Sequence, residues 1–237
     1  MIYKSSIGNL IFWDSYERQL NKFKKIGINL SAGTDSALVL FMTCRELIDR
    51  NKTDVTIVPI TGVDIKRPTN EWNAKEIVML MKKWFPTVKF REHQINRYRK
   101  LNQHDKTRNH VEHETRLRNE GIIDVLFHGR TANPPEDIAL KHDLLQQRET
   151  RRDVHGNDRI PYHENHGHPF YCPMEYLDKR FVAEQYHKFD LMDELFPITA
   201  SCVEYASKTD YFTKPCKECW WCKEKKWAFD MYDGGVK

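Results

Sequence analysis

A short apolar run that breaks into a small polar loop is the feature that most constrains this chain. Residues 26–30 predict a buried parallel strand, and the loop Ser31-Ala32-Gly33-Thr34-Asp35-Ser36 follows it. A helical apolar spacing then runs through Leu38, Phe41, Met42 and Ile48. A strand, a tight turn and a helix N-terminus present backbone N–H groups and the positive end of a helix dipole to one anion. The pattern therefore predicts a phosphate site at the edge of a sheet.

The residue types of this loop suit the phosphates of a nucleotide. Gly33 allows close approach to the backbone, and Asp35 fits beside phosphates once a divalent cation lies between them. Hydroxyl donors are added by Ser31, Thr34 and Ser36. The ordinary alternative is a helix capped by Ser or Asp. The segment resembles the Ser-Gly-Gly-x-Asp-Ser loop of the PP-loop ATP pyrophosphatases, with Ala32 in the place of a glycine.

Strands and helices alternate beyond the loop, which predicts an α/β fold with a doubly wound parallel sheet. We expect a helix near 36–50 and another over 68–85. The expected strands are 54–60, 88–90 and 122–127. The segment from Ile60 to Asp64, which includes Gly62, and the segment His128-Gly129-Arg130-Thr131 would then lie beside the loop, at the carboxyl edge of the sheet.

The remaining segments are less regular. Residues 1–25 predict a polar lead-in with a short amphipathic helix over 13–24. Residues 132–171 predict mostly loop, with a helix near 136–151, and are long enough for an active-site flap. A helix is expected over 173–196, with Asp178 as a candidate N-cap ahead of Lys179.

The basic stretch 91–118 has two interpretations. It is either a solvated surface helix with its connecting loop or a patch for phosphates or a nucleic acid backbone. A formal net charge of +4 suits polyanionic ligands without requiring nucleic acid. The absence of a membrane-length apolar run and of a signal-peptide core leads us to expect a cytoplasmic protein.

Four of the six cysteines gather near the C-terminus with the spacing of a metal site. They are Cys202, Cys216, Cys219 and Cys222. A Cys₄ set is typical of a closed structural zinc site. An iron–sulfur cluster is the alternative, although the next cysteine of a ferredoxin-like run would fall at position 226, which is Lys226. We expect about one zinc ion per chain.

A second group, His163, His166, His168 and Cys172, could also bind a metal. Histidines in a polar loop are more often exposed, so we favour the ordinary interpretation.

Taken together, several motifs resemble those of the 7-cyano-7-deazaguanine synthase family of PP-loop enzymes. They are the loop, Gly129-Arg130, Lys179, Ser201-Cys202, the Lys-Pro-Cys-x-x-Cys-x-x-Cys tail and Ala228-Phe229. The family's Tyr-Gly-Gln-x-His segment is replaced here by residues 61–67, which keep little beyond Gly62, and its Gly-Arg-Asn ends in Thr131. The resemblance implies an adenine nucleotide alpha hydrolase-like domain over 1–200, with 132–170 as a flap or insertion, and a zinc-binding segment over 201–237.

The resemblance also implies a reaction and a set of site residues. The enzyme would use ATP and Mg²⁺ to adenylate 7-carboxy-7-deazaguanine, and ammonia would give the amide and then the nitrile. ATP would be held by residues 31–36 with Ile60, Gly62 and Gly129. Asp35 would meet Mg²⁺, and Arg130 and Lys179 would neutralise phosphate charge. The bland alternatives are a surface salt bridge for Arg130 and a solvated position for Lys179.

Other functions stay open from sequence alone. They are a PP-loop enzyme that thiolates or amidates a tRNA base, a ligase for another acid, and a silent ATP- or zinc-binding scaffold. The intact loop argues against a silent scaffold, and thiolation needs a reactive free cysteine. We expect a small-molecule acid and ammonia as partners, no membrane and no direct nucleic-acid substrate. A homodimer stays open.

Overall fold

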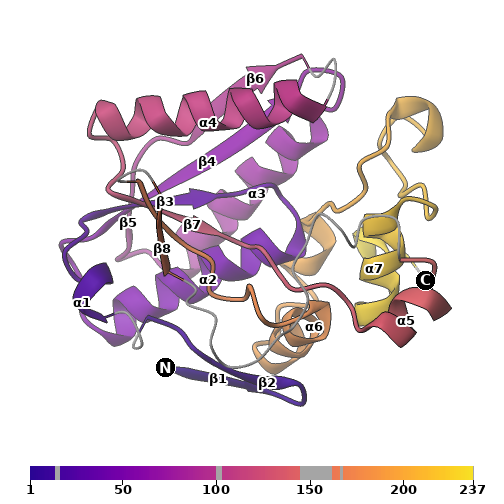
Figure 1. Ribbon diagram of the computed structural model, residues 1–237, viewed down its shortest axis with the longest axis horizontal. Helices are drawn as coiled ribbons and strands as arrows, with labels where there is room; N and C mark the ends of the chain where they lie inside the picture. Colours follow the sequence, from indigo (N-terminus) through magenta and orange to yellow (C-terminus); the bar gives the residue numbers. More distant parts are fainter. Residues whose placement is uncertain (14–16, 100–102, 145–161, 166–167, 237) are drawn as a thin grey trace.

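A mostly parallel sheet with helices on both faces forms the body of the computed structural model (Figure 1). The structure describes residues 1–13, 17–99, 103–144, 162–165 and 168–236. The strand order is β5-β4-β3-β7-β9-β8, and β6 also pairs with β4. All neighbours are parallel except β8 and β9. The strands are β3 Lys25–Asn29, β4 Thr56–Asp64, β5 Lys89–Phe90, β6 Gln94–Tyr98, β7 Val125–His128, β8 Tyr162–Asn165 and β9 His168–Tyr171.

The helices connect these strands and cover both faces. They are α1 Glu17–Leu20, α2 Thr34–Asp49, α3 Thr69–Trp84, α4 Gln103–Asn119, α5 Glu136–Lys141, α6 Lys179–Lys188 and α7 Trp220–Phe229. Helix α2 leads from β3 to β4 on one side of β3, whereas β7 lies on the other side of β3. The chain therefore winds in both directions from β3, and the doubly wound sheet is confirmed. The gap between β3 and β7 is the switch point where such sheets bind ligands.

Alternating side chains of the strands fill two cores. Ile57, Val125 and Phe127 belong to the larger core with buried residues of α2, α3 and α6. Val58 and Leu126 point to the other face, where Leu117 of α4 covers them. This period of two along buried strands is what a sheet covered on both faces requires.

Three segments differ from the sequence expectations. The lead-in forms a hairpin, β1 Ile2–Ser5 and β2 Gly8–Ile11, and only a four-residue helix α1 follows. The basic stretch contains the edge strand β6 as well as helix α4. The expected flap contributes β9, whose residues pair with β7. These strands are polar or short, so they depend on pairing with a neighbour that lies far away in the chain.

Two helix predictions were too long, and part of one cannot be compared. The helix expected over 173–196 is α6 alone, with Asp178 at its N-cap as predicted. The helix expected near 136–151 begins as α5 and ends at Lys141. Residues 145–161 lie outside the described part, so the rest of this prediction is not compared. Among the described residues, none of the helices combines the length and the apolar content that crossing a membrane takes.

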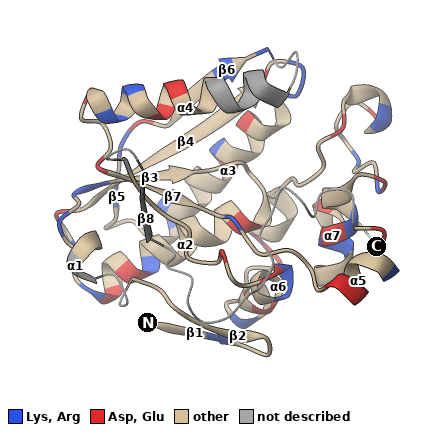
Figure 2. Ribbon diagram, in the orientation of Figure 1, with Lys and Arg blue, Asp and Glu red and all other residues tan. Residues whose placement is uncertain are grey.

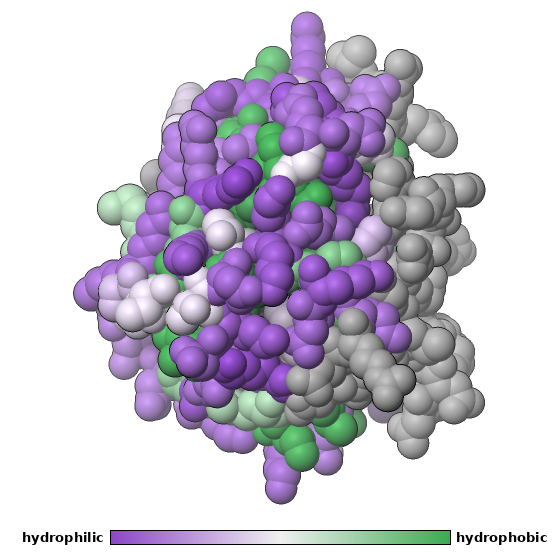
Figure 3. Space-filling model, turned by 90° about the vertical axis from the view of Figure 1, so that its left-hand side faces the viewer, coloured by the Kyte–Doolittle hydropathy of each residue, from purple (hydrophilic) through white to green (hydrophobic). Residues whose placement is uncertain are grey.

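Charges of both signs are mixed in Figure 2, and on the described part of the face in Figure 3 apolar side chains form no large patch. Figure 2 shows acidic and basic residues together on the described part of α4, and Arg97 of β6 is bound at 2.6 Å by Glu71 of α3. That ion pair holds the pKa of the Glu71 carboxyl at about 2, through hydrogen bonds from Arg97 and Lys75. On the face in Figure 3, hydrophilic residues predominate and hydrophobic residues form small separate groups.

Candidate functional site

The predicted loop lies at the carboxyl edge of the sheet and leads into α2, a helix of which most residues are buried. Leu30 donates its N–H to the Ile60 carbonyl at 2.7 Å, which ties the end of β3 to β4. Helix α2 begins at Thr34, and Gly33 at its N-cap has no side-chain cap. The first amides of a helix have no partner within the helix. The N-terminus of α2 therefore offers uncapped donors and a positive dipole end at the switch point.

Two of the three hydroxyls of the loop, those of Ser31 and Ser36, lie together. Ser31 Oγ and Ser36 Oγ lie 3.2 Å apart, and Ser36 Oγ donates to the Gly33 carbonyl at 3.1 Å. Ser201 Oγ lies 3.9 Å from the place where a Cβ on Gly33 would be. It is buried and has no hydrogen-bond partner in the described part of the chain. Ser201 is thus a further hydroxyl beside the loop, which we did not assign to the nucleotide site from sequence.

Ala32 adopts the left-handed backbone conformation that its glycine counterpart would favour. Its φ is +67°, and its side chain is fully buried. An alanine in this region is strained by about 1–2 kcal/mol. The Ala200 N–H donates to the Ala32 carbonyl at 2.8 Å and so helps to hold the turn. An alanine with positive φ therefore forms the turn at this position.

Gly129 is needed because two backbones meet there. Strand β7 pairs with β3 up to Asn29 and His128, and Gly129 is the next residue. A Cβ on Gly129 would lie 2.5 Å from the Ser36 nitrogen, well inside ordinary contact. The end of β7 therefore runs directly against the first turn of α2, and a role for Gly129 in nucleotide binding stays a prediction.

Gly62 and Ile60 are placed by packing. Ile60 is buried beneath α4, and its carbonyl accepts from Leu30. A Cβ on Gly62 would lie 2.2 Å from Cε1 of His110 on α4. The glycine at position 62 thus has a packing reason, and a role for it in nucleotide binding stays a prediction.

Lys179 and Asp35 form the strongest polar contact of the site. The Lys179 ammonium lies 2.7 and 2.6 Å from the two Asp35 carboxylate oxygens. The Lys179 side chain is 3% exposed and the Asp35 side chain 14%. Glu224 of α7, fully buried, lies 3.4 Å from the same ammonium. Lys179 is therefore a buried cation of the site, which excludes the solvated alternative.

Arg130 is held less tightly. Its side chain is 46% exposed, and Nη1 lies 3.5 Å from an oxygen of the buried Glu175. At this length, and with the arginine half-exposed, the pair contributes little to stability. Arg130 follows Gly129 at the carboxyl edge, so its position suits an anion, although the salt-bridge interpretation also fits its present contact.

Two buried histidines support the edge of the sheet. His93 Nε2 lies 2.8 Å from Thr61 Oγ1, which also donates to the Leu30 carbonyl at 2.7 Å. Burial lowers the pKa of His93 to about 4 and that of His128 to about 3. Both rings are therefore neutral near pH 7 and serve as hydrogen-bonding supports for the strand ends. The sequence analysis placed His128 at this edge as part of the segment 128–131 but did not single out His93.

The four C-terminal cysteines come together as predicted. One sulfur from each of them lies within 4.8 Å of the others, and Cys216 Sγ and Cys222 Sγ are 3.8 Å apart. A tetrahedron with metal–sulfur bonds of about 2.3 Å has edges of about 3.8 Å. Backbone N–H groups of Cys216 and Cys219 donate to neighbouring sulfurs at 3.4 and 3.3 Å, which favours thiolates. The residues thus fit one tetrahedrally coordinated metal ion.

The second candidate metal group falls mostly outside the described part of the chain, because nothing is described of the side chains of His163, His166 and His168. Among the described residues, the four clustered cysteines form the one group of ligands close enough to share an ion. Cys172 is fully buried in the core, and His166 lies outside the described residues. His163 and His168 belong to the hairpin of β8 and β9.

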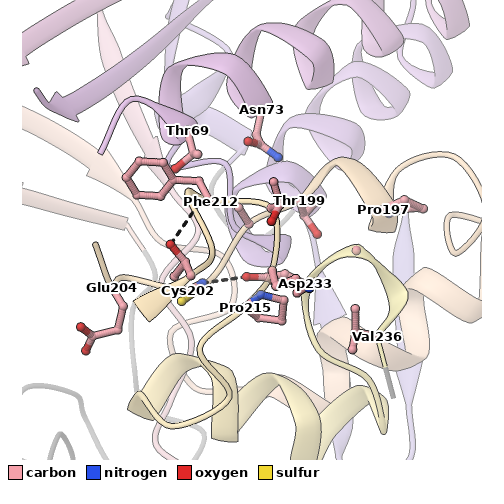
Figure 4. A pocket seen from close by; sticks show the side chains of 15 residues that line it. Thr69, Asn73, Pro197, Thr199, Cys202, Glu204, Phe212, Pro215, Asp233 and Val236 are labelled. Atoms are coloured by element: carbon pink, nitrogen blue, oxygen red, sulfur yellow. Dashed lines mark hydrogen bonds between the residues drawn. The ribbon is translucent and has the colours of Figure 1, made fainter. Parts of the chain in front are cut away.

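A cavity of about 210 Å³ lies where the cysteine segment meets α3 (Figure 4). Its lining includes Asn73 of α3, Thr199 and Cys202, and Asp233 near the chain end. Several of these groups already have partners in the chain. Asp233 accepts from the N–H groups of Ser201 and Cys202 at 2.8 Å and from Lys225 at 2.6 Å. The cavity therefore shows few free polar groups that converge on a ligand.

Comparisons with known proteins add little to this geometry. No protein-family model matches the chain, and no curated protein matches it. The solved U34-tRNA thiolase NcsA from Methanococcus maripaludis, with its [4Fe-4S] cluster, is similar over 70% of this chain at 14% identity and a TM-score of 0.44. The chain covers 57% of the length of that structure. At such a score the likeness carries no argument, and the functional inference rests on the residues of this chain.

Proposed function

We propose that this chain is a PP-loop ATP pyrophosphatase that activates a carboxylic acid with ATP and forms a carbon–nitrogen bond. The observation that carries the proposal is the uncapped N-terminus of α2 at the switch point, with Asp35 and the buried Lys179 beside it. A positive helix end, hydroxyl donors and a buried cation suit a polyphosphate, and a carboxylate next to them suits its metal.

The loop residues would stabilise the pyrophosphate as it leaves. Amides of the first turn of α2, with the hydroxyls of Ser31 and Ser36, are fixed donors where negative charge grows in the transition state. Lys179 and Arg130 are the two cations to which we assign the neutralisation of phosphate oxygens at this edge. Mg²⁺, when bound, would screen the phosphates and polarise them toward attack, and Asp35 is the carboxylate placed to ligate it.

We further propose 7-carboxy-7-deazaguanine and ammonia as substrates. The carboxylate attacks the α-phosphorus of ATP, which gives an acyl-adenylate and pyrophosphate. Ammonia displaces AMP to form the amide, and a second ATP activates the amide oxygen so that its loss as AMP leaves the nitrile, with a second pyrophosphate released. The support is the motif set of the loop and the tail. Residues 61–67 and Thr131 differ from that family, so a ligase for another acid is the alternative.

The free cysteines favour C–N bond formation over thiolation of a tRNA base. Outside the metal cluster the chain has Cys44 and Cys172, and both are fully buried. Burial also raises the pKa of the Cys44 thiol far above its usual range. A persulfide carrier has to be accessible and thiolate-like, and neither residue meets that condition.

We assign the cysteine cluster to zinc with a structural role. A single ion holds four sulfurs closer together than a cluster in which each sulfur binds a different iron, and the separations fit the single ion. All four positions of the ion are taken by protein, so none is left for a substrate. The division into an ATP-binding domain over 1–200 and a zinc segment over 201–237 belongs to the same proposal, although Phe229 packs into the main core.

The test is a reaction with ATP, Mg²⁺, ammonium and 7-carboxy-7-deazaguanine, in which AMP, pyrophosphate, amide and nitrile are followed by mass spectrometry. AMP that depends on the acid supports the proposal, and the nitrile identifies the full reaction. Asp35→Asn should lose AMP formation while the metal content stays at about one ion per chain. AMP formed only with another acid would replace the substrate, and wild-type protein that neither binds ATP nor releases AMP would overturn the proposal.

A further inference from the structure

Lys179 is a buried cation that two carboxylates share. Its side chain is 3% exposed, and its ammonium contacts both oxygens of Asp35 and one oxygen of Glu224. Removing every anionic partner would leave an uncompensated charge in the interior, which is strongly destabilising. Lys179 therefore needs a carboxylate partner in every state of the site.

The proposed function places a competing demand on Asp35. Mg²⁺ is bound through carboxylate oxygens at about 2.0–2.1 Å. In the structure both Asp35 oxygens are occupied by Lys179, at 2.7 and 2.6 Å. When Asp35 turns toward a metal, its attraction for Lys179 weakens because the metal carries a larger positive charge close to the same oxygens.

Glu224 is close enough to bind the Lys179 ammonium when Asp35 has turned toward the metal. It is fully buried, and its oxygen lies 3.4 Å from the ammonium, so a movement of about 0.6 Å gives an ordinary charge-assisted hydrogen bond. We propose that Glu224 is a positioning residue that takes over Lys179 when Asp35 ligates the Mg²⁺ of bound ATP. This inference rests on the proposed function.

The cysteine cluster fixes the position of Glu224. Helix α7 has Cys219 at its N-cap and contains Cys222, one half-turn before Glu224. The next residue, Lys225, is anchored to Asp233 at 2.6 Å and to Thr199 Oγ1 at 3.0 Å. The first turn of α7 is thus held by metal ligands on one side and by a buried ion pair on the other. A role for the cluster in the ATP site follows, through the placement of one carboxylate.

The experiment compares Glu224→Gln with Glu218→Gln, a matched change at an exposed position of the cysteine knuckle. Binding of a non-cleavable α,β-methylene ATP is measured by calorimetry in EDTA and over a series of Mg²⁺ concentrations, with thermal unfolding alongside. We expect Glu224→Gln to raise the Mg²⁺ concentration for half-maximal binding about 10-fold, because Lys179 then stays on Asp35. In EDTA the affinity should stay within about 3-fold, since Lys179 is still in place. Glu218→Gln should match wild type throughout.

Several outcomes would overturn the inference. An unchanged Mg²⁺ dependence of Glu224→Gln, or an equal loss of affinity with and without Mg²⁺, would mean that Glu224 has only a structural role. Should Glu224→Gln not fold, Glu224→Asp decides: we expect a smaller shift in Mg²⁺ dependence, and no shift contradicts the proposal. Wild-type protein that binds no nucleotide would instead refute the proposed function itself.

Discussion

Replacing Gly33 with alanine should weaken ATP binding by the loop without weakening the folding of the chain. Gly33 has φ −77° and ψ 163°, which any residue adopts. A Cβ there would lie 3.5 Å from Ser31 Oγ and 3.9 Å from both the Ala200 carbonyl and Ser201 Oγ, all ordinary contacts. No contact within the described residues therefore requires glycine at position 33, and the requirement would come from a ligand that approaches the backbone closely.

The magnitudes follow from this geometry. A Gly→Ala change at a compatible backbone conformation stabilises a protein by about 0.4–1 kcal/mol through the unfolded chain. For a chain of this size, that raises Tm by about 1–4 °C. The new methyl group would displace a phosphate from the backbone, and losing one hydrogen bond to such a charged group costs about 1.5–3 kcal/mol. The Kd for ATP should therefore rise about 10- to 100-fold.

Gly121→Ala is the matched control. Gly121 has φ +63° and open space around its Cβ position, and it lies after α4, at the start of the connection to β7. We expect a loss of about 1–2 kcal/mol in stability from backbone strain and an unchanged Kd for ATP. Thermal unfolding and calorimetry are measured on both variants. Gly33→Ala should raise Tm and weaken ATP binding, whereas Gly121→Ala should lower Tm and leave ATP binding unchanged. If Gly33→Ala binds ATP as wild type does, the loop is not the phosphate site; if it unfolds at a lower temperature, the packing argument is wrong.

Three further predictions address the supports of the site. Gly129→Ala should destabilise the protein by about 1–3 kcal/mol and lower the rate of AMP formation, because a Cβ 2.5 Å from the Ser36 nitrogen forces the end of β7 away from α2; wild-type thermal unfolding would contradict this. The unfolded chain binds more protons at His93 and His128 below pH 6.5, so the free energy of unfolding should fall toward pH 4 by up to about 1.4 kcal/mol per pH unit for each histidine, and urea unfolding of His93→Gln should show a smaller fall. Cys202→Ser should lower both the zinc content and Tm, and iron in the wild-type protein would contradict the zinc assignment.

The parts of the fold that the sequence predicted well are those that local signals determine. Strand β3, the loop and α2 form one continuous segment in which the apolar run, the small residues and the helical spacing agree. The cysteine cluster was predicted for the same reason, since three of its ligands lie within seven residues. Local agreement of this kind leaves little for distant contacts to override.

The missed strands depend on partners far away in the chain. Strand β6 is polar and charged, and it forms because the carboxyl half of β4 extends past β3 and needs a partner. Strand β9 lies in a polar region, yet Tyr171 is fully buried and packs on Phe12 and Phe127, with ring centroids 5.6 and 5.0 Å apart. The run Pro169-Phe170-Tyr171-Cys172 was the signal that could have revealed this strand.

No local pattern in the sequence indicates that the tail contacts the loop. This contact is the basis of a final prediction. The Ala200 N–H donates to the Ala32 carbonyl, and Cys202, two residues later, belongs to the cluster. The Leu30 N–H, by contrast, donates to Ile60 within the sheet. Removing the metal with a chelator should therefore speed hydrogen exchange at Ala200, while Leu30 stays protected, because local opening follows the loss of local restraints.

Hydrogen exchange after chelation, measured together with the Mg²⁺ dependence of ATP binding, distinguishes three possible roles of the cluster. If exchange at Ala200 rises and the Mg²⁺ dependence of ATP binding weakens together, the metal supports the loop through both the 200–202 backbone and Glu224. If both residues exchange faster to the same extent, the metal stabilises the whole chain and has no particular connection to the loop. If Ala200 stays protected, packing in the core holds the turn at Ala32 without the metal. The burial of the Ala32 methyl group would then be enough to maintain its strained backbone.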